Sequence, residues 1–314
     1  MASLQDTLDS DDYDEFGLLH ENAAEWDLPF ERRPVVSRAS HTLPTGQQLS
    51  YLRWGVEDPE LVFLHGGAQN AHTWDTVALA LGRPAVAIDL PGHGHSDRRQ
   101  DRNYGPWRNA EAVAAVMEAV APAARCVIGM SLGGATTIRL AAQRPDLCRR
   151  AVLVDVTPQI NDPSRHLTTA ELGTVSLIGG PPVYATFEEM ADATVALSPY
   201  RAASGVRRGV RHNARRLDDG HWTWRYDLFG PTQGEETADR GWVDFTSLWE
   251  DVSAITVPVL FVRGGLSPFV LDEDIVEMRR RLPALEVVVV DGAGHAVQSD
   301  RPLVLADLIH VFAL

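Results

Sequence analysis

Several residue types are scarce or missing in this sequence of 314 residues. There is no lysine, and all 28 side chains in the lysine-plus-arginine class are arginine. The two cysteines, Cys126 and Cys148, form no Cys-x-x-Cys motif, which favours two reduced, packed thiols in a cytoplasmic protein. No run of about 18 apolar residues occurs, so no membrane-spanning helix is expected. The N-terminus has neither a basic start nor an apolar stretch, so a secretory signal is not expected either.

Basic charge is also scarce relative to acidic charge. The chain has 43 acidic against 28 basic side chains, which gives a formal net charge of −15. Such a surface repels the phosphates of nucleic acid and the headgroups of an anionic membrane, so neither is expected as a partner. With 45% hydrophobic residues, the composition is nevertheless that of a globular protein with a large core.

The acidic charge is concentrated at the start of the chain. Residues 1–30 carry nine acidic side chains and no arginine. We expect residues 1–34 to form an acidic arm that is mobile or loosely packed, because such a composition buries little apolar surface. The few apolar side chains of the arm could still dock it on the core, and they are Phe16, Leu18, Leu19 and Trp26.

From about residue 35, short apolar strands alternate with helical patterns. This alternation is typical of a mostly parallel sheet that is covered by helices on both faces, so the predicted fold class is α/β with about eight strands. The expected strands are 35–43, 48–54, 61–66, 85–90, 126–130, 151–156, 258–264 and 285–292, with helices that include 71–81, 111–120 and 133–143.

The stretch from 157 to 250 interrupts the alternation. It is rich in arginine, tryptophan, proline and glycine, and it is too long for a plain connection between two strands. We expect it to form a helical cap, inserted into a core that consists of residues 35–156 and 251–314.

A Gly-x-Ser-x-Gly pattern occupies residues 129–133, with Ser131 at its centre. The pattern directly follows an expected strand and directly precedes an expected helix. That is the setting of a nucleophile elbow, in which a sharp turn displays the serine above the strand end and the helix points its first amides at the same place. The alternative is a serine that only caps the helix. We interpret Ser131 as the candidate nucleophile.

Together with this motif, three further segments make the chain resemble the α/β-hydrolase family. The four segments occur in the family's order, and the resemblance covers roughly residues 35–314. They are LHGG at 64–67, DLPGHGHSD at 89–97, GMSLGG at 129–134 and GAGH at 292–295. As a set they are specific for the fold, but they say little about the substrate.

The resemblance implies the other parts of a serine hydrolase. A serine hydroxyl needs a base to take its proton, and the resemblance places that base at His295, in a glycine-rich loop after the last expected strand. It assigns the two backbone donors of the oxyanion hole to Leu132 and Gly67. His65, at the start of the oxyanion loop, is expected to tie that loop down.

The acid that orients the base departs from the family's usual pattern. In the family it follows the strand that is here 258–264, but the loop has Pro268 near the expected place, and Asp272 and Asp274 come only later. Relatives also place the acid at the end of the preceding core strand, which here carries Asp155. We expect Asp155 to complete the triad, with Asp272 or Asp274 as the alternative. An aspartate that only bonds loop amides is the other interpretation of Asp155.

These residues predict a serine hydrolase that forms an acyl-enzyme with a small-molecule substrate and needs neither a metal nor an organic cofactor. Carboxylic esters of small apolar or aromatic compounds are the default substrates. Three alternatives stay open: a carbon–carbon bond hydrolase acting on a diketone or dienone, a cofactor-free perhydrolase or acyltransferase, and a ligand-binding protein without turnover. The sequence leaves the oligomeric state open, a homo-oligomer included.

The cap is expected to supply most of the substrate pocket. Its aromatic side chains either line that pocket or form the cap's own core. Its arginines either face a substrate carboxylate or pair with acids on a solvated helix. The aromatic residues are Trp222, Trp224, Tyr226, Trp242 and Trp249, and the arginines are Arg207, Arg208, Arg211, Arg215 and Arg216.

Overall fold

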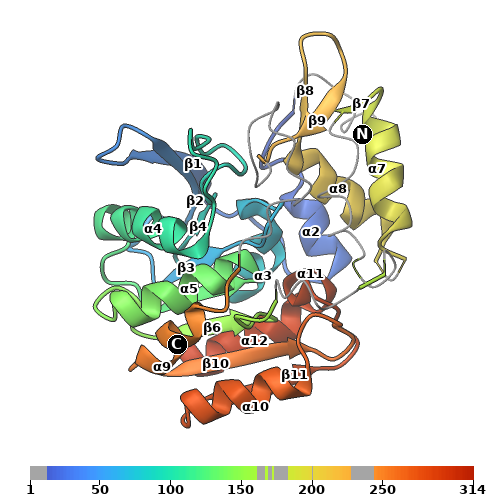
Figure 1. Ribbon diagram of the computed structural model, residues 1–314. Coiled ribbons are helices and arrows are strands. Elements are labelled where there is room, and N and C mark those ends of the chain that lie inside the picture. The colour runs from blue at the N-terminus through green and yellow to red at the C-terminus, as the bar shows by residue number, and fades with distance from the viewer. Residues whose placement is uncertain (1–12, 161–166, 169–171, 173–182, 200, 228–243) are drawn as a thin grey trace, which may run out of the picture.

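A computed structural model describes residues 13–160, 167–168, 172, 183–199, 201–227 and 244–314 (Figure 1). Its centre is an eight-stranded sheet in the order β1-β2-β4-β3-β5-β6-β10-β11. β1 and β2 pair antiparallel, as do β2 and β4, whereas the other neighbouring pairs are parallel. The strands are β1 (Val36–Thr42), β2 (Gln48–Trp54), β3 (Leu61–Leu64), β4 (Ala85–Ile88), β5 (Cys126–Met130), β6 (Ala151–Val154), β10 (Val259–Gly264) and β11 (Glu286–Val290). The predicted α/β fold with a mostly parallel sheet is confirmed.

The inner strands are apolar at every position because both faces of the sheet are covered. In β3, Val62 and Leu64 belong to the cluster on one face, whereas Leu61 and Phe63 belong to the cluster on the other. All four side chains have 0% exposure. The alternation follows from the period of two along a strand, and it explains why these segments read as continuous apolar runs.

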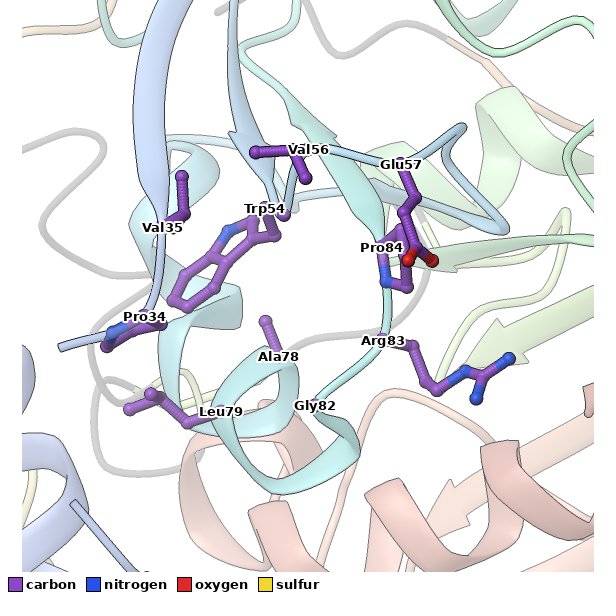
Figure 2. A pocket seen from close by; sticks show the side chains of 11 residues that line it. Pro34, Val35, Trp54, Val56, Glu57, Ala78, Leu79, Gly82, Arg83 and Pro84 are labelled. Carbon is purple, nitrogen blue, oxygen red and sulfur yellow. The ribbon is translucent and has the colours of Figure 1, made fainter. Parts of the chain in front are cut away.

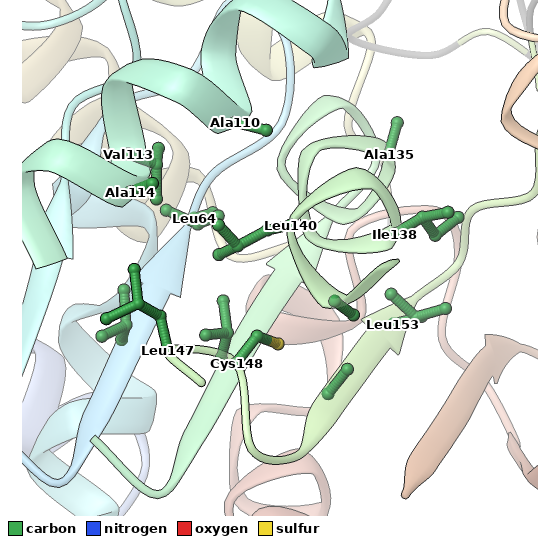
Figure 3. Packing of buried hydrophobic residues seen from close by; sticks show 14 of the residues in the cluster. Leu64, Ala110, Val113, Ala114, Ala135, Ile138, Leu140, Leu147, Cys148 and Leu153 are labelled. Carbon is green, nitrogen blue, oxygen red and sulfur yellow. The ribbon is translucent and has the colours of Figure 1, made fainter. Parts of the chain in front are cut away.

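Helices from distant parts of the chain cover each face. One face packs against α4 (Pro106–Val120), α5 (Leu132–Gln143), α9 (Leu248–Ala254) and α10 (Asp272–Arg281). The other packs against the 3-10 helix η1 (Ala71–Trp74), α3 (Asp75–Leu81), α11 (Val297–Asp300) and α12 (Pro302–Ala313). Figure 3 shows the first face, where Leu64 and Leu153 of the sheet lie beneath Val113 of α4 and Leu140 of α5.

The segment between β6 and β10 adds a second layer, which contains strands as well as helices. Among the described residues, this second layer contains the helices α7 (Phe187–Ala196) and α8 (Ala203–Asn213), and its three-stranded sheet has the order β7 (Val183–Tyr184), β9 (Trp222–Trp224), β8 (Ala214–Arg216). Figure 1 shows these elements gathered beside α2 (Leu19–Glu25).

The aromatic residues of this segment lie in different apolar clusters. Trp224 and Tyr226 are buried in an apolar cluster of the second layer, and Trp222 packs against that cluster, so these rings form the layer's own core. Trp249 lies on α9 and packs against the core of the main sheet. Trp242 lies outside the described residues.

Two arginines of α8, Arg207 and Arg208, pair with acids. Arg207 contacts Glu188 and Asp192 of α7. Arg208 contacts Glu25, at the end of α2, and Arg208 is only 5% exposed. For these two arginines the predicted pairing with acids is present, although Arg208 is buried instead of lying on a solvated helix face.

The described part of the N-terminal arm is docked. Leu18 lies in the apolar cluster of the second layer, and the next residue, Leu19, lies in the cluster between the main sheet and α12. Both are buried, and Phe16 packs against the second of these clusters. Residues 13–34 thus take the docked arrangement instead of the loosely packed one, and α2 joins the two layers.

A small apolar pocket lies at one end of the sheet, around Trp54 (Figure 2). Its walls include Pro34 and Val35 on one side and Ala78 on the other. Trp54 pairs with Ala85, the first residue of β4, so the pocket lies at the amino ends of the parallel strands. In the described residues, no helix is long and apolar enough to cross a membrane.

Candidate active site

Ser131 occupies the turn between β5 and α5. Its backbone has φ 51° and ψ −117°, a conformation that non-glycine residues rarely adopt. Strained residues of this kind persist where the surrounding structure holds them, often at functional sites. The Ser131 side chain does not cap α5, so the helix-capping interpretation is not supported. This strand–turn–helix geometry is that of a nucleophile elbow.

The two glycines of the motif are required by close packing. A Cβ atom at Gly129 would lie 2.4 Å from the carbonyl oxygen of Gly133, and one at Gly133 would lie 2.3 Å from the carbonyl oxygen of Leu64. Any larger residue would push α5 away from β3 and β5. The spacing of the pattern is therefore set by how tightly the helix returns over the strand.

His295 and Asp155 meet although they come from different loops. Nδ1 of His295 lies 2.7 Å from Oδ2 of Asp155, whose side chain has 0% exposure. Asp155 directly follows β6, where Val154 pairs with Met130, and Ser131 directly follows Met130. Ser131 and Asp155 thus lie beyond the same edge of the sheet, and the Ser131 amide donates to the Val154 carbonyl.

The two alternative acids lie elsewhere. The Asp272 side chain is 94% exposed and pairs with Arg263. Asp274 accepts a hydrogen bond from the Leu271 amide, so it caps the first turn of α10. The structure brings Asp155, not Asp272 or Asp274, to His295.

Asp155 is held by three donors. Oδ1 accepts the amide of Gly264 at 2.9 Å, and Oδ2 accepts the Ser267 hydroxyl at 2.5 Å in addition to His295. Asp155 itself has φ 49°, another left-handed backbone. Ser267 in turn accepts the Phe269 amide, and the Phe269 ring lies 4.2 Å from the His295 ring. Phe269 thereby packs against the base.

The sequence did not single out Ser267 or Phe269. Ser267 directly precedes Pro268, in the loop where the usual acid was sought and not found. A hydroxyl next to that position was the only available signal. This hydroxyl can be recognised as part of the site only once β10 is known to lie beside β6, because that pairing brings the loop after β10 to Asp155.

The oxyanion loop runs from His65 to Asn70 beside Ser131. A Cβ atom at Gly66 would lie 3.2 Å from Cβ of Ser131. The Gly66 amide is already bonded to Oε1 of Gln69, and the Gln69 amide is bonded to the Gly66 carbonyl. By contrast, the amide of Gly67 makes no hydrogen bond with the described part of the chain, and a Cβ there would meet open space.

Leu132 offers the second free amide. It is the first residue of α5, and the first amides of a helix have no partner inside the helix. Its side chain is buried, whereas its backbone N–H belongs to the end of the helix that faces Ser131. Gly67 and Leu132 therefore carry amides near the nucleophile that make no hydrogen bond with the described part of the chain.

His65 ties the oxyanion loop to the loop after β4, as expected. Its Nε2 accepts the Leu90 amide, so Nδ1 carries the proton and donates to the Gly66 carbonyl. Burial lowers the pKa of His65, which keeps the ring neutral. Burial also lowers the pKa of His93 to about 3, whereas partial desolvation and the charges of Arg38 and Arg225 lower the pKa of His95 to about 4.

A second cluster of titratable groups lies between the two layers. His72, Asp75 and His212 offer ligand atoms within 4.8 Å of one another, a metal-like grouping that the sequence pattern did not indicate. Both nitrogens of His72 are already bonded, Nδ1 to Asp75 and Nε2 to Glu15. The His72 and His212 rings stack in parallel at 3.9 Å. A metal would have to displace these bonds, because ligand lone pairs lie in the ring plane.

The fold, the strained serine after β5 and the Asp155–His295 pair define an α/β hydrolase. A family model for the alpha/beta hydrolase fold matches residues 59–302. The match spans well over half of the chain, and the protein belongs to this family.

Individual proteins within the comparisons are also similar to this chain. The chain is 48% identical over 297 residues to the esterase Rv0045c of Mycobacterium tuberculosis, covering 94% of each chain. A solved structure of that esterase matches with a TM-score of 0.82 at 47% identity, covering 95% of this chain and 98% of the other. The chain is also 30% identical over 264 residues to the sn-1-specific diacylglycerol lipase ABHD11 of Mus musculus, covering 81% of this chain and 80% of that protein.

Proposed function

We propose that the protein is a serine carboxylester hydrolase with Ser131 as nucleophile, His295 as base and Asp155 as the acid that orients the base. The hydrogen bond from Nδ1 of His295 to the buried Asp155 carboxylate is the observation that carries the proposal. A carboxylate partner fixes the proton on Nδ1, which leaves Nε2 free to accept a proton from Ser131.

The proposed reaction passes through an acyl-enzyme. Nε2 of His295 takes the hydroxyl proton as Ser131 attacks the substrate carbonyl, and the amides of Leu132 and Gly67 stabilise the developing oxyanion. The intermediate collapses as His295 gives its proton to the leaving alcohol. His295 then activates a water molecule, which releases the carboxylic acid and restores Ser131.

Residues 157–250 are proposed to act as a cap on the core formed by residues 35–156 and 251–314, with α9 packing as part of that core. Small apolar or aromatic esters are the proposed substrates. The names of two similar proteins, an esterase and a diacylglycerol lipase, support ester cleavage. The two free, buried cysteines support a cytoplasmic location.

A fluorophosphonate tests the proposal without knowledge of the substrate, because an activated serine displaces its fluoride and becomes covalently labelled. Intact mass should show one equivalent bound to the wild type and none to Ser131→Ala or His295→Ala. Ser247→Ala, which changes an exposed serine outside the site, serves as the matched control and should label fully. A wild type that does not label would reject the proposal. Turnover of esters compared with diketones then separates ester cleavage from carbon–carbon bond cleavage.

A further inference from the structure

The second layer touches the oxyanion loop directly through Asn213, the last residue of α8. Its side-chain amide Nδ2 donates to the Ala68 carbonyl at 2.7 Å. Its Oδ1 accepts Nδ2 of Asn70 at 3.3 Å, and the same Asn70 nitrogen also donates to the His212 carbonyl at 3.0 Å. Asn213 is 8% exposed, so these bonds are made away from water.

Asn213 bonds to a residue whose backbone conformation is unfavourable. Ala68 has φ 59°, in the left-handed region that is unfavourable for a residue with a Cβ. Ala68 directly follows Gly67, whose backbone is unusually free because it lacks a side chain. A donor fixed on the Ala68 carbonyl therefore also limits where the neighbouring Gly67 amide can point.

We propose that Asn213 is a positioning residue, which holds the Ala68 carbonyl so that the Gly67 amide points at the oxyanion. The inference rests on the proposed ester hydrolysis. Both parts of the molecule then contribute to the oxyanion hole. The core supplies the amides of Gly67 and Leu132, and α8 of the second layer sets the direction of the Gly67 amide. A rigid connection matters here, because a misplacement of about 1 Å costs roughly 10²-fold in rate.

The second layer is also attached to the core at a second place, through Asp227 and the loop after β4. There, Asp227 accepts the Tyr104 hydroxyl at 2.6 Å and Nη2 of Arg102 at 3.0 Å, and its amide donates to the Gly92 carbonyl. A contact that only fixes the second layer to the core should behave like Asp227. A contact that positions the oxyanion loop should not.

The test compares Asn213→Asp with Asp227→Asn. Asn213→Asp keeps the shape and the acceptor for Asn70 but faces the Ala68 carbonyl with an oxygen instead of a donor. Asn213→Ala, which removes the side chain without adding charge, is the second variant. Thermal unfolding of each variant shows that it folds and reports how much stability it has lost.

The decisive readout is the ratio of kcat for an ester to kcat for the matching thionoester, since sulfur accepts hydrogen bonds poorly and reports on the oxyanion donors. For both Asn213 variants we expect kcat on the ester to fall about 10- to 100-fold with KM within about threefold, and the ratio to shrink. Asp227→Asn should lose thermal stability while keeping the ratio of the wild type. The pH profile of kcat should keep its shape in all variants, because the Asp155–His295 pair is untouched.

Wild-type kcat and ratio in the Asn213 variants would overturn the inference, and so would a fall in kcat with an unchanged ratio. Failure of the proposed function is distinguishable from these outcomes. It would appear as a wild type that neither labels with fluorophosphonate nor turns over the ester.

Discussion

Nδ1 of His295 lies 2.7 Å from Oδ2 of Asp155, although 140 residues separate the two in the chain. The contact depends on the order of the strands. β6 carries Asp155 at its end, β10 lies next to it, and the loop after β11 returns His295 over both. A Cβ atom at Gly264, the last residue of β10, would lie 2.1 Å from the Gly294 carbonyl, so the His295 loop is packed directly on that strand end.

Asp155→Asn should therefore lower kcat/KM by about 10³- to 10⁴-fold, the scale for neutralising the carboxylate of a triad. The asparagine can present its NH₂ group to Nδ1, which favours the tautomer with the proton on Nε2 and blocks proton transfer from Ser131. Ester turnover measured beside thermal unfolding checks this, because Asp155 also accepts the Gly264 amide. The control is Asp272→Asn at the exposed alternative, which should keep near wild-type turnover. The reverse pattern would move the acid to Asp272.

Ser267→Ala should lower kcat about tenfold and leave KM almost unchanged. The hydroxyl donates to the same Asp155 oxygen that His295 contacts, so its loss removes one of three restraints on that carboxylate. The magnitude follows from one neutral or charge-assisted hydrogen bond of about 1–2 kcal/mol. Steady-state kinetics with one ester measures it.

Ser267→Thr is the conservative partner of that variant and should recover most of the lost kcat, because it keeps the hydroxyl. If the threonine variant is as slow as the alanine variant while both fold, then packing at this position, and not the hydrogen bond, sets the rate. Ser247→Ala, at an exposed position before α9, controls for serine removal in general.

The parts of the site that sequence could predict share one property: each is marked by a local pattern. Ser131 lies between two glycines at a strand–helix junction, and His295 follows a strand in a glycine-rich loop. Asp155 could be chosen only through the resemblance, because relatives also place the acid near the end of the expected strand 151–156. The sheet followed for the same reason, since strands buried on both faces are continuous apolar runs.

The missed features depend on contacts between distant residues. Ser267 becomes informative only beside Asp155, 112 residues away, and Asn213 only beside Ala68, 145 residues away. The strands β7, β8 and β9 span only two or three residues each, too short for a period of two to show. The docking of the arm was not decided by the sequence, because neighbouring Leu18 and Leu19 serve different clusters and show no helical stripe.

Leu19→Ala should lower the free energy of unfolding by about 2–5 kcal/mol, the range for removing a buried leucine side chain. Leu19 is 1% exposed and packs in the cluster between the main sheet and α12. Urea denaturation followed by tryptophan fluorescence measures the change. Val311→Ala, at an 85% exposed position of α12, should stay within about 0.5 kcal/mol of the wild type. An equally small effect of Leu19→Ala would mean that residues 13–34 are not docked in solution.

The stability of the fold should pass through a maximum near neutral pH, because histidines whose pKa values the fold shifts titrate on either side of it. Burial lowers the pKa of His93 to about 3, and partial desolvation together with the charges of Arg38 and Arg225 lowers the pKa of His95 to about 4, both below the ordinary 6.5. Between those values the unfolded chain binds protons that the folded chain does not, so stability falls as pH falls. Carboxylates have the opposite effect on His72: despite its burial, Asp75 and Glu15 raise its pKa to about 9. The folded chain then binds the extra proton between about 6.5 and 9, so stability falls as pH rises there.

Melting temperatures measured from about pH 4.5 to pH 9 should therefore decline on both sides of neutrality. His95→Gln should flatten the acid side, because it removes one histidine that the fold keeps neutral, and leave the alkaline side unchanged. His310→Gln, at an exposed position of α12, is the matched control and should follow the wild type across the range. An acid side as steep in His95→Gln as in the wild type would show that the proton uptake on unfolding belongs to other groups.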